Sequence, residues 1–110
     1  METPKELKVG GFVYKIVPIT PESKETASGI CHRDIKVIEI DFDLLPVDVA
    51  DTAIHEALHA IFYERGLYHI LGYENEEHIV SQFATGLVEI IRRNPKFFLW
   101  CMANATARTR

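Results

Sequence analysis

Cysteine is scarce in this chain, and its scarcity excludes two kinds of stabilising site. The 110 residues contain two cysteines, Cys31 and Cys101, which are too few for a disulfide framework. They do not have Cys-x-x-Cys spacing, so the sequence predicts no cysteine-based zinc site. Long apolar runs are also missing: none approaches the roughly 18 residues that a membrane span requires. We therefore expect neither a disulfide scaffold nor a membrane protein.

The sequence leads us to expect no secretory signal either. The N-terminal stretch METPKELKVGG lacks the basic segment followed by an apolar one that such signals show, so we expect a cytoplasmic protein with reduced cysteines. Apolar residues make up 47% of the chain and charged residues 25%, which is typical of globular proteins. A length of 110 residues corresponds to one domain, with its core over about residues 8–95 and a tail over 96–110.

Acidic residues are missing from the C-terminal end, although the whole chain has a net charge of −4. Residues 1–91 contain seven cations and sixteen acids, a net charge of −9, and the rest contains five cations and no acid. The five cations are Arg92, Arg93, Lys96, Arg108 and Arg110. Because they are widely spaced, we interpret them as a solvated terminus and expect no nucleic-acid partner.

The first 41 residues have the composition of strands. The stretch LKVGGFVYKIVPIT is rich in β-branched and aromatic residues, and Gly10–Gly11 is suited to a hairpin turn. TPESKETAS follows as a polar loop. GICHRDIKVIEID has apolar residues on both alternating faces, which predicts a further strand in a sheet that is covered on one side. We therefore expect about three strands.

The remainder has helical periodicity. Pro46 is suited to a first turn and Gly66 to a stop, so the sequence predicts a helix over residues 47–65. A second helix is expected to begin near Glu74–Glu76 and to end at Asn94-Pro95. KFFLWCMA is expected to form a short third helix or a packed tail. Strands followed by helices indicate an α+β fold. The periodic apolar residues are Ala50, Ile54, Ala57, Leu58 and Ile61 in the first helix, and Ile79, Val80, Phe83, Ala84, Leu87, Val88 and Ile91 in the second.

The first of these helices contains the pentapeptide HEALH. His55 and His59 are four residues apart, so on a helix they project from one face, one turn apart. Two imidazoles so placed can hold one zinc ion, and Glu56 lies within reach of a water molecule there. In this chemistry the zinc acidifies water, the glutamate accepts its proton, and the hydroxide attacks a carbonyl group. The expected chance count of HExxH in such a composition is about 0.02, so we favour a zinc site over two surface histidines.

A catalytic zinc site needs a third protein ligand. The metzincin extension would require glycine at position 62 and histidine at position 65, but the chain has Phe62 and Arg65. The other common arrangement takes a glutamate from a following helix.

That glutamate is expected at the start of the second helix, in YENEEHIVSQFATGL. Glu77 shares the apolar stripe of the helix and is the predicted ligand, with Glu76 as the nearest alternative on the same side. His78 would point about 100° away from Glu77 and is the weaker candidate. Glu74 is interpreted as an acidic residue that favours a helix N-terminus.

The order of these segments resembles that of the small gluzincin-type zinc metallopeptidases. The resemblance covers most of residues 8–95 and rests on IKVIEID, AIHEALHAIFYERG and NEEHIVSQFATGLVEIIRRNP. It is nearest to the minimal peptidases that phages and prophages encode, and more distant from phage anti-repressor peptidases. It implies a zincin-like fold, zinc on His55, His59 and Glu77, and Glu56 as the general base. It also implies that an edge strand, best matched by Ile30–Asp41, binds peptide substrate by strand addition.

Other residues allow less specific expectations. His32 is interpreted as a half-exposed strand residue rather than part of a cleft. His69 and Tyr73, between the helices, are expected to anchor the core, with oxyanion donation as the alternative role. Phe62, Tyr63 and Trp100 are expected in the core. Two further hypotheses remain open: a zinc-stabilised binding or scaffold domain without peptidase activity, and a tail whose Cys101 folds back into the cleft.

Overall fold

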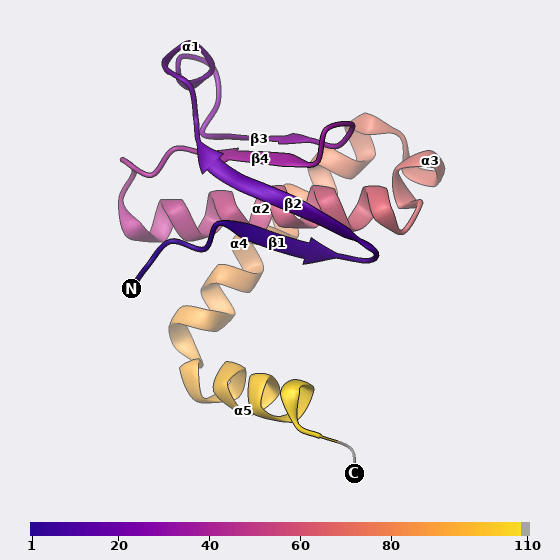
Figure 1. Cartoon of the computed structure of the whole chain (residues 1–110). Helices are drawn as coiled ribbons and strands as arrows, with labels where there is room; N and C mark the ends of the chain where they lie inside the picture. Colours follow the sequence, from indigo (N-terminus) through magenta and orange to yellow (C-terminus); the bar gives the residue numbers. More distant parts are fainter. Residues whose placement is uncertain (109–110) are drawn as a thin grey trace.

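The computed structural model describes residues 1–108, which form one four-stranded sheet and five helices. The α+β class expected from the sequence is confirmed. The long helix α2 lies between the sheet and a second long helix, α4 (Figure 1). The elements are β1 Glu6–Val9, β2 Phe12–Pro18, α1 Pro21–Lys24, β3 Gly29–His32, β4 Val37–Ile40, α2 Pro46–Glu64, α3 Leu67–Leu71, α4 Tyr73–Arg93 and α5 Pro95–Thr106.

The strands are arranged in the order β1-β2-β4-β3. The hairpin of β1 and β2 turns at Gly10–Gly11, as expected, and is antiparallel. β2 pairs with β4 in parallel, and β4 pairs with β3 antiparallel, with Ile30 opposite Glu39. β1 and β3 are therefore the edges of the sheet, and both contact α2, β3 more extensively.

The expectation of about three strands is wrong, because residues 29–41 form two strands instead of one. Residues 33–36 make a turn between β3 and β4, in which Lys36 has a φ of 58°. The apolar pattern continues through this turn at Ile35, which is 64% exposed, and so conceals the break. The predicted substrate-binding strand, Ile30–Asp41, lies at the edge only in its first part, and the part in β4 is interior.

The two long helices lie close to their expected positions. α2 begins and ends one residue before the expected range, with Pro46 in its first turn. α4 begins at Tyr73 and ends before Asn94. Two segments expected as loops contain short helices: α1, which the Thr20 side chain caps by accepting from the Ser23 backbone N–H, and α3.

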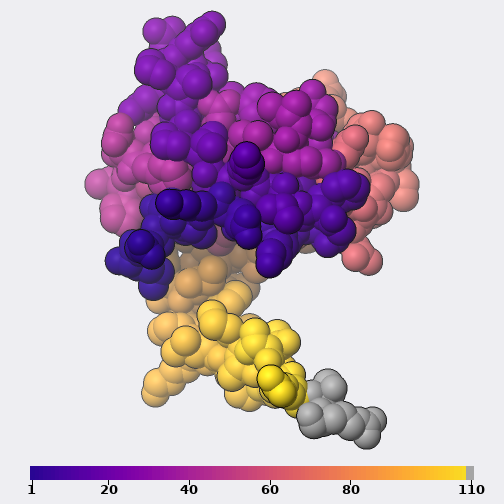
Figure 2. All heavy atoms as spheres, viewed as in Figure 1, coloured from indigo at the N-terminus to yellow at the C-terminus, as the bar shows by residue number. Residues whose placement is uncertain are grey.

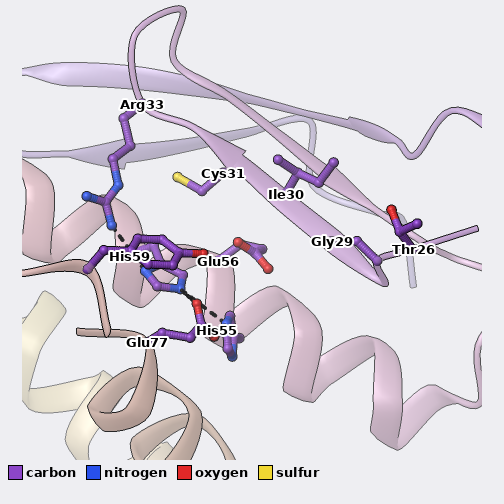
Figure 3. Close-up of a pocket in the computed structure, with 11 residues that line it drawn as sticks. Thr26, Gly29, Ile30, Cys31, Arg33, His55, Glu56, His59 and Glu77 are labelled. Carbon is purple, nitrogen blue, oxygen red and sulfur yellow. Dashed lines mark hydrogen bonds and ion pairs between the residues drawn. The ribbon is translucent and has the colours of Figure 1, made fainter. Parts of the chain in front are cut away.

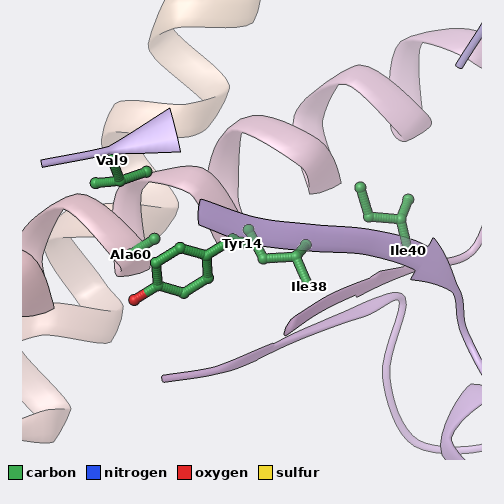
Figure 4. Close-up of a cluster of buried hydrophobic side chains, with 5 residues drawn as sticks. All are labelled: Val9, Tyr14, Ile38, Ile40 and Ala60. Atoms are coloured by element: carbon green, nitrogen blue, oxygen red, sulfur yellow. The ribbon is translucent and has the colours of Figure 1, made fainter. Parts of the chain in front are cut away.

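The apolar core lies between the sheet and α2 (Figure 4). The buried side chains of the strands meet Ala60 from α2, and Tyr14 is completely buried among them. The Tyr14 hydroxyl donates to Glu64 Oε2 at 2.5 Å, and Lys36 Nζ lies 2.6 Å from the same oxygen. This pairing satisfies the buried phenol and fixes the end of α2 against the sheet. The core residues are Val9, Tyr14, Ile38, Ile40 and Ala60.

The buried face of α4 is narrower than its sequence suggests. It consists of Glu76, Val80, Ala84 and Val88, spaced four residues apart, whereas Phe83 and Ile91 are 58% and 38% exposed. On the first helix too, Ala50 and Ile61 are exposed.

α5 stands clear of the rest of the molecule at the end of α4 (Figure 2). Trp100 is 64% exposed, so the expectation that it lies in the core is wrong. Within residues 1–108, no helix has both the length and the apolar character that a membrane crossing needs.

Candidate metal centre

The HEALH residues lie on the part of α2 that passes beneath β3. Glu56 and His59 are buried, with 7% and 6% of their surface exposed, and His55 is partly exposed. Their spacing places the two imidazoles next to each other, with ring centroids 4.8 Å apart. The α-helix thus presents both histidines from one face, as the spacing predicts.

The start of α4 completes a cluster of three donor groups. Glu77 Oε1 lies 2.8 Å from His55 Nε2, and Glu77 Oε2 lies 2.9 Å from His59 Nε2. The two Nε2 atoms are 3.2 Å apart. One ligand atom from each of the three residues therefore lies within 4.8 Å of the others. Figure 3 shows Glu77 reaching from α4 to both histidines.

The donor set fits a tetrahedral zinc ion with a small adjustment. Zinc–nitrogen bonds of about 2.05 Å at the tetrahedral angle separate two donors by about 3.3 Å. The 3.2 Å between the Nε2 atoms nearly matches this separation. The carboxylate, at 2.8 and 2.9 Å, would have to withdraw by about 0.5 Å. The Glu77 side chain is 39% exposed and has room to do so.

Glu76 and Glu77 occupy opposite sides of His59. Glu76 is completely buried and its Oε2 lies 2.5 Å from His59 Nδ1, the nitrogen that faces away from His55. The fully buried stripe of α4 begins at Glu76, the alternative on the same side, whereas Glu77 is partly exposed beside it and still faces α2 as expected. Glu77 nevertheless is the glutamate that meets both Nε2 atoms. His78 is exposed and lies outside this cluster.

Arg33 was not identified from the sequence. It is the first residue of the turn after β3, and its guanidinium donates to Glu76 Oε2 and lies 3.1 Å from His59 Nδ1. Its Cζ lies 5.4 Å and 5.2 Å from the ring centroids of Tyr63 and Tyr68. A single arginine in a turn has no spacing pattern that would have indicated this role.

Burial affects the protonation of Glu56 and His59. Burial, followed by the nearby Glu77 carboxylate, raises the pKa of Glu56 to about 7, although Arg33 acts in the opposite direction. Burial also lowers the pKa of His59, which favours the neutral imidazole that binds metals. Glu56 is therefore a carboxyl group that can both accept and release a proton near neutral pH.

A cleft of about 460 Å³ lies between β3 and the HEALH residues. Its lining includes His55, Glu56, His59 and Glu77 on one side and Gly29, Ile30 and Cys31 of β3 on the other. β3 is an edge strand, so it can pair with a further extended chain on its outer side. The cleft thus places an edge strand directly beside the three donor groups.

The structure also locates the less specific candidates. His32 Nε2 lies 2.5 Å from Glu39 Oε2, and His32 does not line the cleft. Tyr73 is 71% exposed at the rim of the cleft, so it does not anchor the core. His69 is exposed and packs on Tyr68, with ring centroids 4.0 Å apart. Cys101 belongs to α5, which packs against α4 and contributes nothing to the cleft lining.

Comparisons of the chain with protein-family models, with curated proteins and with solved structures found no match. The resemblance to gluzincin-type peptidases therefore stays a prediction. Chemically, the cluster offers two imidazole nitrogens and a carboxylate to one ion, and a separate buried carboxyl group beside them. That combination is suited to metal-assisted hydrolysis.

Proposed function

We propose that this protein is a zinc-dependent peptidase. The observation that supports this most is the convergence of His55, His59 and Glu77 beside the buried Glu56, in a cleft bordered by an edge strand. The three convergent residues would hold the zinc ion. Glu56 does not belong to this set of ligands, and a site that only bound metal would not require a second carboxyl group beside it.

In peptide hydrolysis, the zinc and Glu56 would have different roles. Zinc, when bound, supplies Lewis acidity that activates water and polarises a carbonyl group. The Glu56 carboxylate would accept the proton of the water and later deliver it to the leaving amine. Glu56 is buried, and its side chain packs so closely on Gly29 that a Cβ atom added there would lie 3.1 Å from Glu56 Cγ. The Glu56 side chain therefore has little room to turn away from the cleft.

The substrate would be an extended peptide. The outer edge of β3 would pair with it through backbone hydrogen bonds, which align a peptide without reading its side chains. β3 has four residues, so it can align only a short segment. Tyr73 at the rim is in a position to contact the same segment.

The test is metal content and cleavage in the full-length protein. Wild type loaded with zinc should contain about one zinc ion per chain and cleave members of an unstructured peptide library. Glu56→Gln should retain the zinc and lose cleavage, because it keeps the ligands and removes the proton acceptor. His55→Ala should lose both.

Glu74→Gln is the matched control, since Glu74 is an exposed acid in the same turn of α4. It should behave as wild type. If wild type and Glu56→Gln both bind zinc and neither cleaves any peptide, the alternative of a zinc-stabilised binding domain is favoured. If wild type binds no zinc, the proposal is refuted.

A further inference from the structure

The nitrogen of His59 that faces away from the donor cluster has its own set of partners. His59 Nδ1 lies 2.5 Å from Glu76 Oε2, while Nε2 of the same ring faces His55 and Glu77. Histidines that bind a metal through one nitrogen commonly donate the other N–H to a carboxylate, which fixes the ring and its tautomer. Glu76 is in the position for this interaction.

The partners of Nδ1 determine where the proton lies. A neutral imidazole has one N–H and one lone pair, a carboxylate only accepts, and a guanidinium only donates. A lone pair on Nδ1 would face a lone pair of Glu76 Oε2 at 2.5 Å, which is repulsive. Arg33 already donates to this oxygen. Glu77 Oε2, 2.9 Å from Nε2, also only accepts, and Arg33 lies 3.1 Å from Nδ1. The contact of Nδ1 with Glu76 is the shorter one and is completely buried, so it favours a proton on Nδ1 and leaves the lone pair of Nε2 to the metal side.

The contact of Glu76 with His59 and Arg33 contributes little to the stability of the fold. Glu76 is completely buried, and its second oxygen, Oε1, has no hydrogen-bond partner within the described residues 1–108. Buried ion pairs contribute little net stability, and an unpartnered buried oxygen has a free-energy cost. An apolar residue on the Val80–Ala84–Val88 stripe would avoid that cost. The contact with His59 gives the carboxylate a role that packing does not.

Arg33 connects this contact to the edge strand. It follows His32, the last residue of β3, and its guanidinium lies against the adjacent rings of Tyr63 and Tyr68. Its side chain is 18% exposed. The position of Glu76, and through it the position of His59, thus depends on the turn that ends the strand.

We propose that Glu76 and Arg33 are positioning residues, which hold His59 as its Nδ1–H tautomer and thereby set the zinc affinity of the site. This proposal rests on the proposed zinc site. It assigns Glu76 a role through His59 rather than a bond to the metal, and it gives the turn after β3 a share in metal binding.

The first experiment measures zinc affinity by competition with a chromophoric chelator. Glu76→Leu should bind zinc about 10- to 100-fold more weakly than wild type, as expected for loss of a carboxylate that orients a ligand. Glu76→Gln should lose less, because the amide oxygen still accepts from Nδ1–H. Glu77→Gln should lose more than either. Glu74→Gln should bind as wild type does.

The second experiment determines the tautomer of His59 in the metal-free protein from long-range ¹H–¹⁵N NMR correlations. Wild type should show the Nδ1–H form, and Glu76→Leu should shift the population toward Nε2–H. A merely structural role would not produce this change. Because Glu76→Leu leaves Arg33 without its partner, Arg33→Met/Glu76→Leu is measured beside it. The double variant removes both charges and should show the same tautomer change in a folded chain.

The outcomes separate this proposal from the proposed function. If wild type binds zinc tightly and folded Glu76 variants keep both its affinity and its tautomer, the positioning role is refuted and the zinc site stands. The same holds if wild-type His59 is in the Nε2–H form. If wild type binds no zinc, the proposed function fails and the effect on affinity fails with it.

Discussion

Replacing Gly29 with alanine should disturb both the fold and the cleft. Gly29 begins β3 and packs tightly against α2. A Cβ atom there would lie 2.6 Å from Thr52 Cγ2, and 3.1 Å from both Glu56 Cγ and the Glu39 carbonyl oxygen. The first distance is too short for two non-bonded carbons, so either the Thr52 side chain must rotate or the strand and the helix must move apart.

The magnitude follows from two opposing effects. Overpacking by one methyl group costs about 1–3 kcal/mol, while alanine gains about 0.5–1 kcal/mol over glycine in an extended segment. Gly29→Ala should therefore lower the free energy of unfolding by roughly 1–2 kcal/mol. For a domain of this size, that corresponds to a Tm lower by about 4–8 °C.

Chemical and thermal unfolding of a double-mutant cycle would test this reasoning. Thr52→Ser removes the methyl group that clashes, so Gly29→Ala/Thr52→Ser should recover about half of the loss. The contact with the Glu39 carbonyl oxygen would account for the rest. Gly86→Ala is the control: among residues 1–108, nothing beyond its own turn of α4 lies within 4 Å of the position that a Cβ would take, so it should stabilise the protein by about 0.5–1 kcal/mol. The reasoning is refuted if Gly29→Ala is as stable as wild type, or if the two substitutions are additive.

Three further predictions concern pH, thiol chemistry and the C-terminal helix. The His32 side chain lowers the pKa of buried Glu39, so the stability that ionised Glu39 contributes is complete near pH 7 and is lost as the pH falls through the lowered pKa. The Tm difference between wild type and Glu39→Gln should thus shrink below about pH 4, and a difference that is constant with pH would contradict this. Burial raises the pKa of the Cys31 thiol to about 12, so at pH 8 iodoacetamide should modify Cys31 at least about tenfold more slowly than Cys101, as mass spectrometry can measure. Equal rates would contradict the raised pKa of the Cys31 thiol. A chain that ends at Asn94 should bind zinc with unchanged affinity, because α5 packs against α4 and not against the donor cluster; a weaker affinity in chelator competition would count against this.

The helices were predictable because their signals are local. Proline, glycine and apolar spacing determined α2 and α4 to within a few residues. The alternation of apolar and polar residues did not reveal the turn at residues 33–36, because Ile35 continues the apolar pattern through this exposed turn. The expectation for Trp100 was wrong because the apolar composition of its segment, KFFLWCMA, is typical of a buried helix, whereas α5 has few neighbours within the described residues.

The donor residues show the same difference between what local spacing determines and what tertiary packing determines. The spacing of His55 and His59 determines their geometry once the helix is known. Glu76 and Glu77 are adjacent, so periodicity alone could not show which one α4 turns toward the Nε2 atoms. That depends on the packing of α4 on α2, a tertiary property. Arg33 depends on the position of the turn after β3, which the sequence pattern did not reveal.

The unequal exposure of the two glutamates has a kinetic consequence. His59 and Glu76 are fixed by packing on the buried faces of α2 and α4, whereas the Glu77 side chain is 39% exposed at the mouth of the cleft. An ion could therefore enter or leave when this one side chain turns aside, while both helices stay folded. Chelators should strip the site without unfolding the chain, and the histidines would remain arranged for the next ion.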